Sequence, residues 1–318
     1  MSSTCLDALD RRIVGALQID GRASWRAIAL ALDAPERTVT RRGTALLSDG
    51  TVRVSGLAPR GDSLVVRVRC TPGSSRLTAR ALAAREDTTF AYLVTGSTDC
   101  VAEVIAPPDT RAQFLLEALP TIPGVVSMTT APVLRYLRTV HEWRPNLLTE
   151  AEQDRLGAIT PPPIPPRQLD RPTTTPRDRA IIKALHDNGR CTYEELGRLV
   201  GVSEPTARRR VEALRRDGQV YIRSVVDARA LGYSTSVMLW IRTPPAQVDA
   251  TAAALVESPY VRYAAALMGN DQIVAELALP SLQGVYDVIT SAPWSEFATA
   301  LDTCLVIQAV KTSGVVVA

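Results

Sequence analysis

The chain has 318 residues, of which 46% are hydrophobic and 22% charged, so it has enough apolar residues to form packed cores and is not compositionally disordered. Its net charge of +3 is too small to indicate nucleic-acid binding by itself. Five cysteines without a Cys-x-x-Cys pair, no signal-peptide pattern and no apolar run near the ~20 residues of a membrane span predict a cytoplasmic protein without disulfides or membrane contact.

The first segment, residues 1–59, returns later in the chain. Residues 10–52 align without a gap with residues 178–220, and 16 of the 43 positions are identical. The identities are spread along the whole stretch, so one accidental motif does not explain them. A repeat this long indicates duplication of whole domains.

Each copy is predicted to form three short helices and a strand. In the second copy, Thr192 and Glu195 form a capping-box pattern before an apolar stripe, and Ser203 caps the helix that follows the tight turn "GVS". Asp217-Gly218 ends this third helix before the strand "QVYIRSVV". The order helix, helix, short turn, helix and strand indicates a helix-turn-helix with a small wing, over residues 1–59 and 176–227.

A β-α-β-β-α-β pattern follows each of these segments, over residues 60–140 and 228–318. Both strand sets are apolar on both faces, and two helices can cover only one face of such a sheet, so we expect the two sheets to pack face to face. The predicted strands and helices cover 63–70, 74–84, 88–95, 100–106, 109–119 and 125–137, then 235–242, 245–256, 260–267, 272–279, 281–290 and 301–311. The fold class is therefore α+β, with two winged helix-turn-helix domains alternating with two ferredoxin-like domains.

Residues 141–175 separate the two copies. Leu148 to Leu156 can form a short helix, whereas "TPPPIPP" cannot, and the segment is interpreted as a semi-rigid extended linker rather than as a Pro-rich peptide ligand.

The chain resembles the Lrp/AsnC family of transcription regulators through "LDALDRRIVGALQIDGRASWRAIALAL", "ERTVTRRGTALLSDGTV" and "TGSTDCVAEV" in its first half. The second half carries "DRAIIKALHDNGRCTYEELGRLVGVSEPTARRRVEALRRDGQV" and "MGNDQIVAEL". A subunit of this family joins a helix-turn-helix to a ferredoxin-like ligand-sensing domain called RAM. The chain differs in holding two subunit equivalents, in a second sensing turn that reads one residue shorter, and in Gly43, which weakens its helix by roughly 1 kcal/mol.

The resemblance implies that each third helix enters the major groove of double-stranded DNA. Arginine suits phosphate oxygens or guanine, and threonine suits phosphate or the thymine methyl group. A solvated charged helix face, supported by pairs such as Glu204 with Arg208, is the alternative, and the half with Gly43 could have lost DNA binding. The candidate DNA contacts are Thr38, Thr40, Arg41, Arg42, Thr206, Arg208, Arg209 and Arg210.

The turns between the central strands of each sensing domain carry Gly96 and Asp99, and Gly269 and Asp271. These residue types suit a turn without any further role. In the resembled family this region lies near the amino-acid effector site where sensing domains meet, so the four residues are candidate effector contacts. The resemblance also predicts self-association through the RAM sheets.

No catalytic or metal site is expected. His141 and His186 are not spaced with cysteines or carboxylates as a ligand set, and the cysteines fit small buried hydrophobes better than sensors. We therefore expect a sequence-specific DNA-binding regulator that responds to an amino acid or another small effector, without a cofactor and without enzymatic activity. The alternative is an enzyme of haem synthesis similar to siroheme decarboxylases, which share the tandem fold, although the sensing stretches here contain no histidine.

Overall fold

The computed structural model describes residues 6–57, 61–140, 142–157 and 174–316. By residue contacts the chain divides into two compact units. The first, which we call the helical unit, is Met1–Pro59 with Arg144–Gly232, and the second, the strand unit, is Arg60–Trp143 with Tyr233–Ala318. The helical unit thus contains the helix-turn-helix segments of both copies, and the strand unit contains both ferredoxin-like segments.

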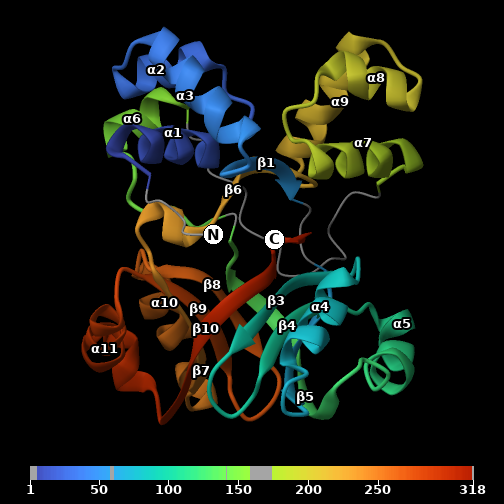
Figure 1. Cartoon of the computed structure of the whole chain (residues 1–318), viewed down its shortest axis with the longest axis vertical. Helices are drawn as coiled ribbons and strands as arrows, with labels where there is room; N and C mark the ends of the chain where they lie inside the picture. Colours follow the sequence, from blue (N-terminus) through green and yellow to red (C-terminus); the bar gives the residue numbers. More distant parts are fainter. Residues whose placement is uncertain (1–5, 58–60, 141, 158–173, 317–318) are drawn as a thin grey trace. The chain divides into compact units, whose positions relative to one another are not determined.

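The helical unit contains two three-helix groups, which Figure 1 shows as separate clusters. Side-chain caps fix where four of these helices begin, because an oxygen of the cap residue accepts a hydrogen bond from an otherwise unpaired amide. The third helix of each group has no such bond; Ser203 stands at the expected N-cap position but its hydroxyl does not accept from the helix. Thr175 and Thr192 form capping boxes with Asp178 and Glu195, as the sequence predicts for the second of these pairs. The helices are α1 (Ala8–Ile19), α2 (Trp25–Leu32), α3 (Glu36–Ser48), α7 (Pro176–Asp187), α8 (Tyr193–Val200) and α9 (Glu204–Arg216).

Each group is followed by one strand, β1 (Val52–Leu57) or β6 (Tyr221–Val226), and the two strands pair with each other in antiparallel register. The wing predicted for each copy is therefore a ribbon shared between the copies. Ser55 lies opposite Arg223, its own equivalent under the sequence repeat. A residue that faces its own equivalent marks a two-fold axis, so the copies are related by an internal pseudo-two-fold at this pair. A short 3₁₀ helix, η3 (Ala228–Leu231), follows β6.

The segment after the first sensing domain packs on the first three-helix group. Here α6 (Glu150–Arg155) begins at the capping box of Thr149 and Glu152 and falls within the short helix predicted from the sequence. The Glu152 carboxylate pairs with Arg12 on α1, and Leu148 packs against Gly15. The Pro-rich run and His141 lie outside the described residues.

The strand unit has the predicted β-α-β-β-α-β order in each half. The first half contains β2 (Ser63–Cys70), α4 (Ser75–Ala84), β3 (Thr88–Val94), β4 (Cys100–Ile105), α5 (Pro108–Gln113) continued by η1 (Phe114–Ala118), and β5 (Val125–Arg138). The second contains β7 (Thr235–Arg242), η4 (Pro245–Gln247), α10 (Val248–Glu257), β8 (Val261–Leu267), β9 (Ile273–Leu279), α11 (Leu282–Ser291), η5 (Pro293–Phe297), β10 (Ala300–Thr312) and β11 (Val315–Val316).

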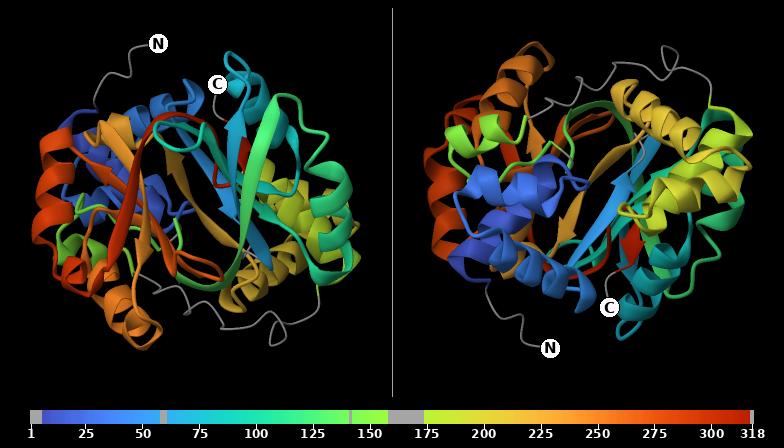
Figure 2. Two further views of the ribbon diagram at one scale, coloured as in Figure 1. Left: turned by 90° about the horizontal axis from the view of Figure 1, so that it is seen from below. Right: turned by 90° about the horizontal axis from the view of Figure 1, so that it is seen from above.

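The long last strand of each half joins the two sheets of this unit. Strand β5 pairs with β2 of its own half and β8 of the other, and β10 pairs with β7 and with β3 in the same way. Eight described strands thereby close into a ring, which removes free sheet edges. Helices α4 and α5 lie on one flank and α10 and α11 on the other (Figures 1 and 2). The predicted face-to-face pairing of sheets thus occurs within one chain.

The ring has an aromatic interior and two outer cores. Tyr92, Trp240 and Tyr263 belong to an inner cluster that draws residues from both halves, whereas each helix layer covers its own half's outer sheet face. The interior also holds two buried carboxylates at equivalent positions, Glu103 and Glu276. Tyrosine hydroxyls donate to both, because a buried carboxylate without partners would be costly.

Candidate nucleic-acid interface

The third helices, α3 and α9, present arginines to solvent. In α9, Ala207, Val211 and Leu214 are buried against the other helices, which leaves the intervening positions outside. Arg208 and Arg209 are exposed there, and Arg41 is the exposed counterpart on α3. These three guanidinium groups are the candidate contacts that are presented most openly.

Arg42 and Arg210 are different from these, because each is held by its own domain. Arg42 pairs with Asp7 and Asp10 at the start of α1, and Arg210 pairs with Asp178, the equivalent of Asp10. The Arg210 contact, aided by Thr175, holds the pKa of the buried Asp178 carboxyl well below its usual value and raises the pKa of Arg210. Both arginines therefore clamp the third helix to the first, and a phosphate contact would have to compete with these carboxylates.

The three candidate threonines are half-buried on the same two helices. Thr206 Oγ1 lies 2.9 Å from the hydroxyl of Ser203, the N-cap residue of α9. Thr38 and Thr40 lie on α3, in its first turn and one residue before Arg41 respectively. The structure thus places the eight candidates on two helices, six of them without an intramolecular ion pair among the described residues.

Gly43 has a packing reason that the sequence alone does not show. A Cβ atom at this position would lie 2.3 Å from Cζ3 of Trp25, so the indole ring occupies the space of a side chain. In the second copy a smaller Tyr193 stands where Trp25 stands, and Val211 replaces the glycine. The glycine and the larger ring therefore compensate for each other across the two helices.

The two copies contact each other through residues that sequence reasoning noted as identical but gave no role. Arg22 Nη1 donates to the carbonyls of Gly189 and Cys191 at 2.8 Å, and Arg190 Nη1 donates to those of Gly21 at 2.7 Å and Ala23 at 3.2 Å. Each guanidinium also covers an aromatic ring of the other copy: Tyr193 at 4.4 Å and Trp25 at 4.6 Å. Burial lowers the pKa of Arg190.

Gly21 and Gly189 lie so close to the other copy that a larger residue would not fit at either position. A Cβ at Gly21 would lie 2.9 Å from the backbone of Arg223, and one at Gly189 would lie 2.8 Å from Val54. Their amides donate to the carbonyls of Ile222 and Val54, both at 2.9 Å. Identical residues at equivalent positions thus build one reciprocal interface, which fixes the two copies as an internal pair.

The candidate effector turns lie at the same end of the strand ring. Gly96 and Gly269 have φ angles of +100° and +145°, which explains glycine at both positions. The Asp99 carboxylate accepts a hydrogen bond from the amide of Cys70 at 2.7 Å. Asp271 instead pairs with Arg242, at 3.4 Å.

The expected alignment of the two turns needs a correction. Val94 N donates to Asp99 O, and the equivalent Leu267 N donates to Gln272 O, so Gln272 rather than Asp271 occupies the place of Asp99. The second turn is not shorter; its aspartate comes one residue earlier.

Arg67 joins the two turns and was missed from the sequence. It donates to Ser97 Oγ at 2.9 Å, pairs with Asp302, and lies 3.7 Å from the carboxylate of Asp271. Its guanidinium also lies 4.1 Å from the centre of the Trp240 ring. Two arginines, Arg67 and Arg69, in a mainly apolar strand were the available signal, but only strand pairing shows that the turns of both halves meet Arg67.

Metal ligands and cysteines are the other groups that could carry chemistry. The described residues contain no group of three or more histidines, cysteines, aspartates or glutamates able to hold a metal ion. Cys70, Cys100 and Cys304 are buried, as predicted, whereas Cys191 is only half-buried, and Cys5 lies outside the described residues. Burial raises the pKa of Cys304 to about 12. Among the helices that the structure describes, none is both long and apolar enough to cross a membrane.

Family models match both kinds of domain. The AsnC-type helix-turn-helix domain matches residues 6–47 and 177–215, and the Lrp/AsnC ligand binding domain matches residues 63–140. The chain is 32% identical over 145 residues to an uncharacterized HTH-type transcriptional regulator of Pyrococcus furiosus. This alignment covers 43% of this chain and 95% of that protein. It is 31% identical over 139 residues to the leucine-responsive regulatory protein of Rhizobium meliloti, covering 42% and 89% respectively.

A solved structure matches nearly the whole fold. The crystal structure of the siroheme decarboxylase NirDL covers 96% of this chain and 93% of its own, with a TM-score of 0.60 and 11% identity. Its complex with an iron-uroporphyrin III analogue gives a TM-score of 0.61 and 12% identity. The expectation that this chain is not an enzyme is therefore corrected, because an enzyme has the same tandem architecture. At this identity the likeness concerns the fold alone.

Proposed function

Because the chain belongs to the Lrp/AsnC family of transcriptional regulators, we propose that it binds double-stranded DNA in a sequence-specific way, with both recognition helices supplied by one chain. In this proposal α3 and α9 enter successive major grooves. Arg41, Arg208 and Arg209 contact phosphates or guanines, and the threonines at 38, 40 and 206 contact phosphate or thymine methyl groups. The protein would act in the cytoplasm, where its DNA is.

The observation that carries this proposal is the reciprocal interface of the helical unit. Arg22 and Arg190 make equivalent contacts, and β1 and β6 pair about their own equivalent residues. Two-fold related recognition helices suit two half-sites ~10–10.5 base pairs apart or a multiple of this spacing. Because the two helices differ in sequence, the site would be an imperfect palindrome with one arm read more strongly.

Arg42 and Arg210 have a double role in this proposal. Their carboxylate partners fix α3 and α9 on α1 and α7, which pre-organises the recognition helices. Since the Arg210 side chain keeps 45% of its exposure, it can still approach a phosphate from within the pair. The larger share of the free positive charge nevertheless comes from Arg41, Arg208 and Arg209.

We further propose that a small effector, such as an amino acid, binds at the end of the ring that carries the turns. Gly96, Asp99, Gly269 and Asp271 remain the proposed contacts, with Arg67 added because it touches both turns. Arg67 offers a guanidinium that a carboxylate could share. Association between chains through RAM domains is also a proposal, and it would use outer surfaces because the sheets already pair within the chain.

The test is capture of genomic fragments by the purified full-length chain, followed by titration of an enriched duplex at several salt concentrations. We expect log affinity to fall linearly with log salt, with a slope near −0.9 for each phosphate neutralised. Affinity that is indifferent to salt, or an absence of enriched fragments, would contradict DNA binding.

The full-length likeness to NirDL supports a second candidate, an enzyme that binds a tetrapyrrole. The same preparation separates the two: titration with an iron-uroporphyrin III analogue should leave the absorption spectrum of the ligand unchanged if the chain is only a regulator. A saturable spectral shift, together with no DNA enrichment, would favour the enzyme.

A further inference from the structure

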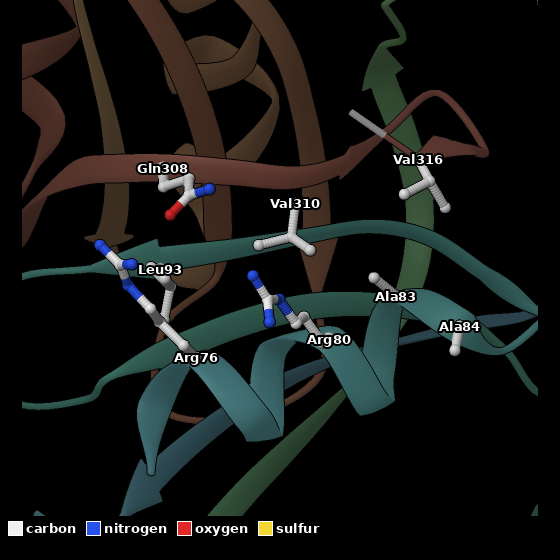
Figure 3. A pocket seen from close by; sticks show the side chains of 8 residues that line it. All are labelled: Arg76, Arg80, Ala83, Ala84, Leu93, Gln308, Val310 and Val316. Atoms are coloured by element: carbon white, nitrogen blue, oxygen red, sulfur yellow. The ribbon is translucent and has the colours of Figure 1, made fainter. Parts of the chain in front are cut away.

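A pocket of about 380 Å³ lies in the strand unit, beside α4, and shares no lining residue with the effector turns. Figure 3 shows the side chains of Arg76 and Arg80 rising from α4 toward the strand that carries Gln308 and Val310. The remaining lining residues are apolar: Ala83, Ala84, Leu93 and Val316. The volume falls in the range of small-molecule sites.

We propose that this pocket binds a small organic carboxylate with an aliphatic chain, its carboxylate held between Arg76 and Arg80 and its chain packed on the apolar residues. The two arginines stand one helical turn apart on one face of α4, so their guanidinium groups can converge on one anion.

The positive charge of the pocket has no internal counterion. No lining residue is acidic, α4 contains no aspartate or glutamate, and neither arginine has an ion-pair partner among the described residues. Arg76 also lies in the first turn of α4, where the helix dipole is positive and a cation is unfavourable. Arg80 is the sixth of the ten residues of α4, beyond the first turn, so only Arg76 carries this small electrostatic cost, which a bound anion would remove.

The second half of the strand unit supplies an internal comparison. Ala91 pairs with Ala102 in the first half, and Ala264 pairs with Ala275 in the second. A residue of the first half is therefore equivalent to the residue 173 positions later in the chain. Asp249 and Ala253 then occupy the places of Arg76 and Arg80, and Arg135 occupies that of Gln308. At that place Asp249 of α10 and Arg135 of β5 pair at 3.6 Å and neutralise each other. The fold therefore does not require the arginine pair.

The absence of an acid from the lining also selects the ligand. A free amino acid brings an ammonium group, and the pocket has no carboxylate to balance it. A 2-oxo acid or a simple aliphatic acid has one negative group and no positive one. We therefore expect deaminated acids to bind more tightly than the corresponding amino acids, in a site separate from the proposed amino-acid effector site.

The test is calorimetric titration of the full-length protein with 4-methyl-2-oxopentanoate, leucine and inorganic phosphate in parallel. Saturable binding of the oxo acid, at least ~10-fold tighter than that of leucine or phosphate, is the expected result. No binding of the oxo acid to the folded protein would overturn the proposal, and so would equal affinity for phosphate, which would indicate a charge trap without an apolar subsite.

Variants then locate the site. Arg76→Gln with Arg80→Gln should weaken binding ~10-fold or more, whereas Arg135→Gln, which removes an arginine from the equivalent place beside α10, should leave binding unchanged. Gln308→Tyr keeps both arginines but fills the pocket from an exposed strand position, and it should also abolish binding. Unchanged binding in the double variant or in Gln308→Tyr would overturn the assignment. None of these readouts depends on DNA.

Discussion

The two copies in this chain have the same order of domains and differ in how equivalent positions are packed and how their charges are paired. In the first helical group a large ring, Trp25, meets Gly43, and in the second a smaller ring, Tyr193, stands at a position whose α9 counterpart is Val211. The first sensing half leaves two arginines without acids, whereas the second neutralises the same place with an ion pair. At the contact between the copies, Gly21 and Arg22 are identical to their equivalents Gly189 and Arg190, although Trp25 and Tyr193 differ. Duplication thus preserved the residues that make the reciprocal hydrogen bonds.

The largest expected effect on stability comes from exchanging the residues at the equivalent positions 43 and 211. Val211→Gly removes a fully buried side chain and adds a flexible residue to α9, and it should lower the free energy of unfolding by about 3 kcal/mol. Gly43→Val should cost about 2 kcal/mol, because the side chain would overlap the Trp25 ring. Both are measured by urea unfolding.

A double variant sharpens this comparison. Trp25→Tyr with Gly43→Val gives the first copy the residues of the second, so it should recover more than half of the loss caused by Gly43→Val alone. A double variant as unstable as the sum of its parts would show that the glycine is not there to admit the ring.

The next effect concerns the ion pairs that join the third helix of each group to the first, Arg210 with Asp178 and Arg42 with Asp10. Asp178→Asn should cost about 2 kcal/mol near neutral pH, since Asp178 is buried, pairs with Arg210 and completes a capping box. Asp10→Asn in the first copy should cost less, because Asp10 is more exposed and Asp7 still holds Arg42.

The Asp178 clamp also has a pH signature. Its pKa is lowered in the folded state, so the stabilisation is complete above the unfolded pKa of about 3.9 and is lost as the pH falls below that value. Acid unfolding monitored by circular dichroism should therefore show a weaker dependence on pH below about 4 in Asp178→Asn. If the wild type and Asp178→Asn lost stability equally between about pH 4 and lower pH, the Asp178–Arg210 ion pair would not stabilise the fold.

A third comparison concerns DNA. Arg209→Ala should weaken binding by about 1–2 kcal/mol, and Arg41→Ala by less, because α9 also presents the exposed Arg208 and is therefore expected to contact DNA more closely than α3. Arg210→Ala should weaken binding more than Arg42→Ala and should also lower stability, since it leaves buried Asp178 without its cation. Duplex titrations measure the first effect, and equal losses for Arg209→Ala and Arg41→Ala would show that both helices read DNA alike.

The smallest expected difference lies at the contact between the copies. Arg22→Ala and Arg190→Ala should each cost about 1 kcal/mol, because each loses hydrogen bonds to two carbonyls and one ring contact. Thermal unfolding of the two variants should agree within about 0.5 kcal/mol. A clearly larger effect of one variant would show that the interface is not reciprocal.

Local signals predicted most of the fold. Capping patterns such as Thr192 with Glu195 and the Asp217-Gly218 stop locate helix ends because they act within a few residues. Apolar residues on both faces of the strands correctly indicated a second sheet. What the sequence could not show is which strands pair: a free wing and the shared β1–β6 ribbon have the same local pattern.

The candidate site was predictable to a smaller extent. The recognition helices follow from the repeat, but the clamping of Arg42 and Arg210 depends on acids 32 residues earlier in the sequence or more, and Arg67 meets both turns only after the ring closes. Glu103 and Glu276 stand in strands that are otherwise uniformly apolar, and partners from other strands explain their burial: a tyrosine for each, and Arg262 for Glu276. Long-range partners of this kind leave no local pattern.

The central claim is that one chain supplies a complete, two-fold-related pair of DNA-reading helices. Hydroxyl-radical footprinting of a captured duplex, with the number of bound chains determined on the same complex by native mass spectrometry, tests it most directly. We expect one chain to protect two patches ~10–10.5 base pairs apart, or a multiple of that spacing, with one patch protected more strongly. A single patch under one chain, or two patches only when two chains are bound, would contradict it.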